Sequence, residues 1–158
     1  MKKIRIEIKW AIIFIVMMLV WVLLEKAFGL HSVNINKHAI YSNFVAIPAI
    51  VIYVFALLDK RKNSYNGKMT YKQGFITGLI ISLIVTVFSP LTQYITSEII
   101  SPDYFQNVIN YTVKKGEMSQ VGAESFFNLK NYVVQVLIAT PIMGIVTTAI
   151  VAIFTKKQ

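Results

Sequence analysis

One carboxylate stands out among the residues that could do chemistry, because it lies at the edge of a long apolar run. Glu25 directly follows the run 10–24. A carboxylate at the hydrocarbon edge of a membrane is ion-paired, reaches outward to water, or serves a function. Lys26 and Lys130 are the cations that could pair with it. Because Glu25 lies at the end of the run and not at its centre, the sequence favours an interfacial or ion-paired role over a proton or substrate site.

The two histidines lie seven residues apart, at positions 31 and 38, in one short connector. Zinc sites typically place histidines at i and i+4 on a helix or pair them with cysteines. Neither pattern is present here, because the histidines lie seven residues apart and the chain has no cysteine. We therefore predict no metal site and no cofactor. The sequence also offers no nucleophile–base–orienter set and no phosphate-binding glycine loop, so we expect the protein not to be an enzyme.

Polar side chains gather on one face of the third apolar run and at the start of the fourth. Buried amides need hydrogen-bond partners in hydrocarbon, and Gln93 and Gln135 could bond to each other. The favoured interpretation is hydrogen bonding that holds the helices together. The alternative is a wet, outward-facing pocket for a small solute. Its candidate residues are Glu25, Ser89, Gln93, Asn131 and Gln135.

Small residues recur at every fourth position in the third and fourth apolar runs. Helices in lipid associate through close backbone approach along such faces. We therefore expect two helix-packing stripes that contact each other, within one chain or between chains. The stripes are Gly74, Gly78, Ser82 and Thr86, and Thr140, Gly144, Thr148 and Ala152.

Four apolar runs must position all these residues: about 10–24, 40–58, 75–95 and 132–154. Each is near the length of about 20 residues that carries a helix across a bilayer. A soluble fold of 158 residues with 56% hydrophobic and 15% charged residues could not bury four such runs. We predict an all-α integral membrane bundle, a single transmembrane domain over 1–158. Its membrane-spanning helices are expected at about 4–28, 40–58, 72–100 and 128–154.

An amphipathic helix is predicted in the long connector before the last span, at about 102–115. Ser101 is a suitable N-cap, and Pro102 suits the first helical position. The residues Phe105, Val108, Ile109 and Thr112 make one apolar stripe. We expect this helix to lie on the outer membrane surface or to cap the bundle.

The basic residues divide unevenly between the two sides of the predicted bundle. The N-terminal tail, the second connector and the C-terminus hold eleven basic and two acidic residues, a net charge of +9, whereas the other two connectors hold five of each. The positive-inside bias therefore predicts both termini in the cytoplasm, in a multi-pass protein of a bacterial inner membrane. The basic residues flank the apolar runs, which indicates contact with anionic lipid and not with nucleic acid.

The first apolar run leaves a second interpretation open. A basic start followed by an apolar stretch is also typical of a cleaved signal peptide, and 27–29 offers a small-x-small cleavage site. The length of the stretch and the charged pair just before that site favour an uncut anchor.

The chain resembles a known family in two places. The stretch 69–75, with Gly78 and Ser82, leads through the third run to 100–105, and Glu25 and Gly29 follow the first run. These residues are similar to those of the small bacterial membrane proteins filed as domain of unknown function 4199. The resemblance covers nearly the whole chain. It implies a four-helix inner-membrane fold with the connector helix, and it implies no activity and no functional residues.

Two functional classes follow. The favoured one is a non-catalytic membrane component that acts by helix packing with other chains or lipids. Its expected partners are the lipid bilayer and, as an open alternative, other membrane proteins or a second copy of the chain. The other class is a small-solute or ion transporter, or a subunit of one, with the polar pocket described above. The strong charge bias argues for one fixed orientation.

Overall fold

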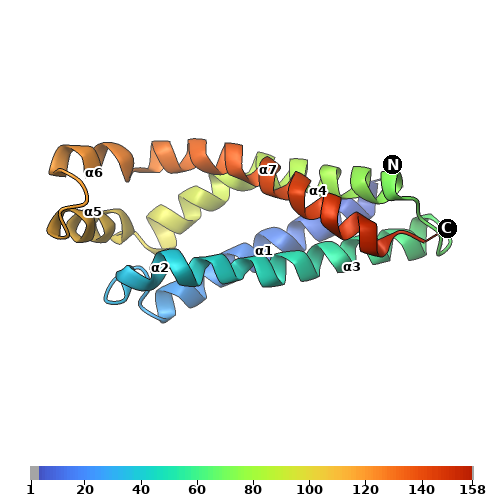
Figure 1. Ribbon diagram of the computed structural model, residues 1–158, viewed down its shortest axis with the longest axis horizontal. Helices are drawn as coiled ribbons and strands as arrows, with labels where there is room; N and C mark the ends of the chain where they lie inside the picture. Colours follow the sequence, from blue (N-terminus) through green and yellow to red (C-terminus); the bar gives the residue numbers. More distant parts are fainter. Residues whose placement is uncertain (1–3, 158) are drawn as a thin grey trace.

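The computed structural model describes residues 4–157, which fold into a bundle of long helices (Figure 1). The second long helix is built from α2, a 3-10 turn and α3 without a break, and α4 ends in a π-helical turn. The elements in chain order are α1 (Arg5–Ala27), α2 (Ile35–Tyr41), the 3-10 turn η2 (Ser42–Val45), α3 (Ala46–Ser64), α4 (Tyr71–Tyr94), the π turn η3 (Ile95–Ile100), α5 (Tyr104–Lys114), α6 (Gln120–Phe126) and α7 (Leu129–Thr155).

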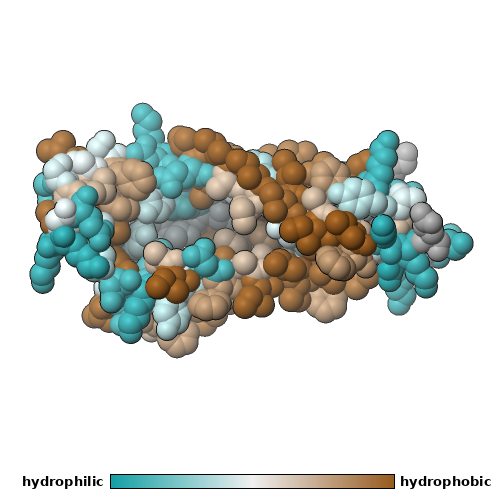
Figure 2. All heavy atoms as spheres, viewed as in Figure 1, coloured by the Kyte–Doolittle hydropathy of each residue, from teal (hydrophilic) through white to brown (hydrophobic). Residues whose placement is uncertain are grey.

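Four of these helical segments are long and apolar enough to cross a membrane. They are Arg5–Ala27, Ile35–Ser64, Tyr71–Ile100 and Leu129–Thr155, and each contains an 18-residue stretch whose mean hydropathy is between 2.0 and 2.3. Large apolar side chains face outward along them; Val87 and Phe154 are 73% and 79% exposed. Figure 2 shows this apolar surface over the middle of the molecule, with hydrophilic residues at both ends. The chain is therefore a membrane protein, and the predicted all-α membrane bundle is confirmed.

The second span is longer at both ends than the predicted 40–58, because it runs from Ile35 to Ser64. At its C-terminal end the charged residues continue the helix. Asp59 accepts hydrogen bonds from Lys9 Nζ at 2.6 Å and from Trp10 Nε1 at 2.7 Å. Lys60 Nζ lies 2.7 Å from Glu7 Oε1, and both side chains are buried. Because these charges pair with α1, they do not end the helix as a solvated charge run would.

Both described ends of the chain lie at one end of the bundle, which we call the basic end (Figure 1). Arg61 Nη1 donates to Thr155 O at 2.8 Å, which joins the ends of α3 and α7. Met69, just before α4, exchanges two backbone hydrogen bonds with Lys157, at 2.7 and 2.9 Å. The four candidate membrane-spanning segments therefore begin and finish at the same end of the bundle.

The two small-residue stripes lie against each other, within one chain, where α4 packs along α7. A Cβ placed on Gly78 would lie 2.3 Å from Thr148 Cγ2, and one on Gly144 would lie 2.2 Å from Ser82 Oγ. Such distances leave room for hydrogen only. Close backbone approach thus sets the spacing of these two helices.

The opposite end, which we call the capped end, is covered by α5 and α6 (Figure 1). Tyr104 and Ile109 of α5 are buried there. Ser101 does not cap this helix as predicted: Asp103 precedes its first turn and makes no capping hydrogen bond. The Ser101 side chain points instead to His31.

Candidate functional site

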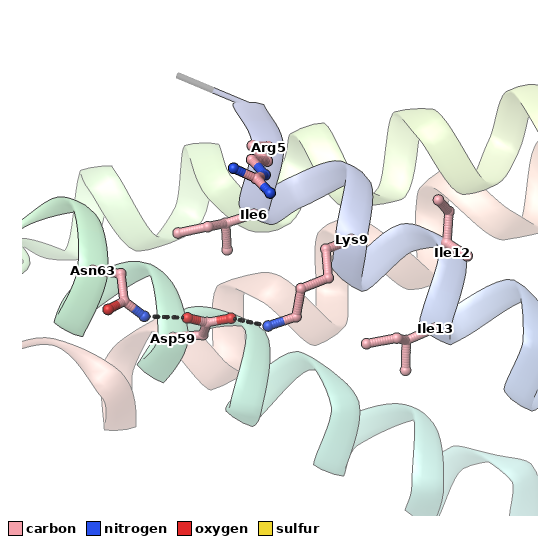
Figure 3. A pocket seen from close by; sticks show the side chains of 7 residues that line it. All are labelled: Arg5, Ile6, Lys9, Ile12, Ile13, Asp59 and Asn63. Carbon is pink, nitrogen blue, oxygen red and sulfur yellow. Dashed lines mark hydrogen bonds and ion pairs between the residues drawn. The ribbon is translucent and has the colours of Figure 1, made fainter. Parts of the chain in front are cut away.

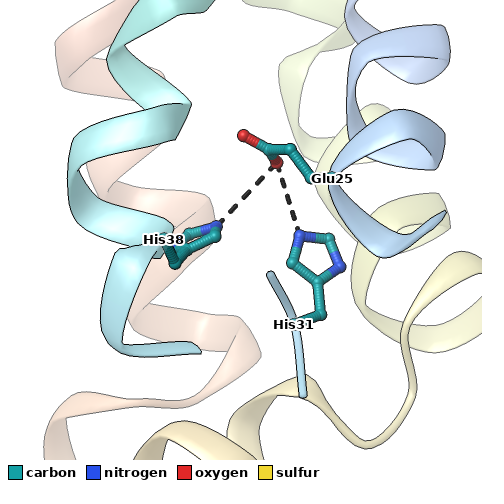
Figure 4. Close-up of side chains that lie close together, drawn as sticks. All are labelled: Glu25, His31 and His38. Carbon is teal, nitrogen blue, oxygen red and sulfur yellow. Dashed lines mark hydrogen bonds and ion pairs between the residues drawn. The ribbon is translucent and has the colours of Figure 1, made fainter. Parts of the chain in front are cut away.

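A buried polar cluster lies at the capped end, where the end of α1 meets the α1–α2 connector and α2. Glu25, His31 and His38 converge there (Figure 4). His31 Nε2 lies 3.3 Å and His38 Nε2 lies 3.8 Å from the same oxygen, Glu25 Oε2. The side chains of Glu25 and His31 are each 7% exposed and that of His38 is 24% exposed. A carboxylate and two imidazoles thus face one another at the edge of the membrane-spanning region.

Glu25 has partners other than the two lysines suggested by the sequence. Its second oxygen, Oε1, accepts a hydrogen bond from Trp21 Nε1 at 2.8 Å, one helical turn earlier on α1. Lys26 Nζ turns away and donates to the carbonyl oxygen of Ile100. Lys130 is exposed on α7. The Glu25 carboxylate is therefore surrounded by an indole, two imidazoles and the Ser42 hydroxyl.

A short reversal of the chain brings His31 back beneath Glu25. Gly29 ends α1 with a φ of +72°, a left-handed conformation that glycine adopts without strain. The Leu30 N–H then donates to Glu25 O at 2.9 Å, so the connector folds back on the last turn of α1. Asn107 of α5 holds the connector from the other side, donating through Nδ2 to His31 O at 2.9 Å.

Hydroxyl groups contact the far side of both imidazoles. Ser101 Oγ lies 2.6 Å from His31 Nδ1, and the Tyr104 hydroxyl lies 3.5 Å from His38 Nδ1. Burial, reinforced by the neighbouring Tyr132 hydroxyl, raises the pKa of Tyr104 far above its usual range. Tyr104 therefore stays a neutral phenol, which can donate or accept a hydrogen bond.

Ser101, His31 and Glu25 stand in the order hydroxyl, imidazole, carboxylate that serine hydrolases use. The sequence analysis did not find this set, because its members are far apart along the chain. Ser101 is only 5% exposed. Neither of the cavities described below touches it. Because this serine is almost fully buried, the order of groups alone does not indicate catalysis.

The structure does not bring the five residues of the predicted solute pocket together. Ser89 Oγ donates to Thr86 O within α4, and Gln93 Nε2 donates to Ser97 Oγ one turn later. Asn131 Nδ2 donates to Ser125 O, and Gln135 is exposed. Ser89, Gln93 and Asn131 are thus satisfied by their own helix or by the adjoining turn. Gln93 bonds to Ser97 and not to Gln135, the partner that the sequence allowed, and Glu25 belongs to the separate cluster.

An apolar groove lies halfway along the bundle, between α3 and α7, with α1 at its base. Its volume is about 440 Å³. Apolar side chains make most of its walls, and the Tyr53 hydroxyl is bonded to Ser82 Oγ at 2.7 Å. Its lining includes Phe14, Met18, Ala49, Ile50, Met143 and Ile150.

A second, more open hollow of about 590 Å³ lies between α1 and α3 at the basic end (Figure 3). Arg5 and Lys9 line it beside Asp59 and Asn63. Asp59 accepts hydrogen bonds from Lys9, Trp10 and Asn63. This carboxylate already has three donors and neutralises Lys9, so Arg5 is the remaining charged side chain that lines the hollow.

Comparison with known proteins gives a family and no activity. The family model described as "Protein of unknown function (DUF4199)" matches residues 9–157. The chain therefore belongs to this family, as the sequence resemblance indicated. No curated protein and no solved structure matches the chain.

Proposed function

We propose that this DUF4199 chain is a non-catalytic component of a bacterial inner membrane and that it acts by binding lipid, with one acyl chain in the groove between α3 and α7. The observation that carries the proposal is the groove itself. It has about 440 Å³ of space, within the range of about 300–1,000 Å³ of small-molecule sites. Most of the side chains that line it are apolar, and Asn43, Thr140 and Thr147 are among the few polar ones.

The shape of the groove favours a single hydrocarbon chain over a helix. Its α7 wall runs from Ala139 to Val151, about 18 Å along the helix axis. Even the whole non-atom space of the groove, about 1240 Å³ including open solvent, gives a mean cross-section of roughly 69 Å² over that length, below the roughly 80–110 Å² of a helix with its side chains. The long axis follows the helices, which is also the direction of lipid tails in a bilayer.

Two further features support lipid over the other interpretations. The small-residue stripes, which are the usual surface for helix association, already contact each other within the chain, so they do not favour self-association. Three polar residues of the predicted solute pocket, Ser89, Gln93 and Asn131, bond within their own helix or the adjoining turn, which weakens the transporter alternative. The uneven charge supports cytoplasmic termini, because the basic end would contact anionic lipid headgroups.

Lipid retention by a groove-filling variant tests the proposal. Ala49→Phe places an aromatic ring in the groove, whereas Ile47→Phe, on the same helix, adds a ring at an exposed position that does not line it. Each protein is purified in detergent, washed in detergent to remove loosely bound lipid, and examined by native mass spectrometry. We expect the wild type and Ile47→Phe to retain one lipid per chain and Ala49→Phe to lose most of it. Equal retention by both variants, or no retained lipid in the wild type, would refute the proposal.

A further inference from the structure

We propose that Glu25, His31 and His38 bind a divalent transition-metal ion, for which zinc is the best-suited probe. This inference is independent of the lipid groove. Two imidazoles and one carboxylate are a ligand set that zinc and iron(II) sites use, with further positions left open for water. Mg²⁺ and Ca²⁺ prefer all-oxygen sets, and the chain has no cysteine to offer thiolate.

The ligand atoms are already near the spacing that one metal ion requires. Nitrogen and oxygen ligands at about 2.0–2.1 Å from zinc stand about 3.3 Å apart in a tetrahedron. The two imidazole Nε2 atoms lie 3.3 and 3.8 Å from Glu25 Oε2, and all three ligand atoms lie within 4.8 Å of one another. Small side-chain rotations would complete the geometry without movement of a helix.

The far side of every ligand has a partner, as in protein metal sites. Ligating histidines usually hold their other ring nitrogen in a hydrogen bond, which fixes the tautomer and aims the free lone pair at the metal. Ser101 Oγ holds His31 Nδ1 at 2.6 Å, and the Tyr104 hydroxyl lies 3.5 Å from His38 Nδ1. Trp21 Nε1 fixes Glu25 Oε1 at 2.8 Å. When both imidazoles carry their hydrogen on Nδ1, the lone pairs of the two Nε2 atoms and of Glu25 Oε2 point into the same space. A cation placed there is attracted by all three atoms.

The surroundings suit a metal ion in two further ways. Lys26, the nearest lysine in sequence, bonds to Ile100 O and so leaves the carboxylate without an ammonium partner. The Ser42 hydroxyl is buried beside the Glu25 carboxylate and within reach of it. It can therefore orient this ligand or a water bound to the metal. His38, the most exposed ligand, marks the entry path.

Zinc binding by the full-length protein tests the site directly. The protein is purified with a tag that contains no histidine, stripped with a chelator and titrated with zinc chloride. Bound zinc is counted by atomic emission, and affinity is measured by competition with a chromophoric chelator. We expect one zinc ion per chain. Cobalt(II) in the same site should show the intense visible absorption of four-coordination.

The variants separate ligands from their supports. Ser101→Ala removes a positioning residue and should weaken zinc binding by about 10–100-fold with the fold unchanged. His38→Ala and Glu25→Gln remove ligands and should weaken it by more than about 100-fold. Glu98→Gln, an exposed glutamate at the same end, should bind zinc as the wild type does. Circular dichroism and gel filtration check folding, and His38→Ala suffices if Glu25→Gln does not fold.

Two outcomes would overturn the inference. A wild-type protein that binds no zinc would leave the cluster as a hydrogen-bond network alone. Zinc binding that is unchanged in His38→Ala would place the ion elsewhere on the chain.

Discussion

The contact between Gly78 of α4 and Thr148 of α7 leads to a sharp prediction for stability. In Gly78→Ala, the new Cβ would lie 2.3 Å from Thr148 Cγ2, 2.4 Å from its Oγ1 and 2.9 Å from its Cβ. A change of rotamer can move the first two atoms. It cannot move the Thr148 Cβ, which is fixed to the α7 backbone. The two helices must therefore separate, and the packing along both stripes is weakened.

A second glycine on the same helix gives the matched control. In Gly74→Ala, the new Cβ would lie 3.2 Å from Met69 Cε, the end of a flexible side chain, and 3.4 Å from Ala152 Cβ. Both variants gain about 1 kcal/mol of helix propensity, and only Gly78→Ala takes the overpacking cost of about 1–3 kcal/mol. The propensity gain cancels between the two. We therefore expect Gly78→Ala to be less stable than Gly74→Ala by about 1–3 kcal/mol.

Reversible unfolding in mixed micelles, with SDS as the denaturant and circular dichroism as the signal, measures this difference. Adding Thr148→Gly to Gly78→Ala removes the three nearest atoms and should recover part of the loss, less about 1 kcal/mol for a glycine within a helix. If Gly78→Ala and Gly74→Ala unfold at the same SDS fraction, the two stripes are not in close contact and the reasoning is wrong.

Two further predictions concern the basic end and the topology. Lys60→Met leaves the Glu7 carboxylate, whose side chain is 2% exposed, without its ammonium and should cost about 3–5 kcal/mol of unfolding free energy. Adding Glu7→Gln to Lys60→Met should recover most of the lost free energy of unfolding. The control Lys62→Met, at an exposed position, should change the stability little. Equal stability of Lys60→Met and Lys62→Met would contradict this account. Because the chain has no cysteine, single cysteines report its orientation: in intact cells an impermeant maleimide should label Glu117→Cys, whereas Ser64→Cys should react only after permeabilisation. The reverse pattern would refute the proposed cytoplasmic termini.

The membrane spans could be predicted from the sequence because hydropathy is a local property. A run such as 75–95 is apolar wherever it is placed, and its transfer into lipid depends chiefly on its own composition. The amphipathic pattern of α5 is equally local. The polar face of α4 fits two structures, a pocket lined by hydroxyl groups or a helix whose serine and threonine hydroxyls bond to its own carbonyl groups. The sequence does not show that Ser89 bonds to Thr86 O, so a pocket remained an alternative.

The candidate metal site depends on the tertiary structure. His31 and His38 lack a recognised ligand spacing, and they approach Glu25 because Gly29 reverses the chain and α2 places His38 opposite the end of α1. The serine that supports His31 comes from a position 70 residues later, after the π turn of α4. Hydropathy and the placement of charged residues are properties of the sequence, and they are enough to predict which segments enter the membrane. Which atoms meet was decided by the packing of those segments, because distances between side chains on different helices depend on how the helices cross.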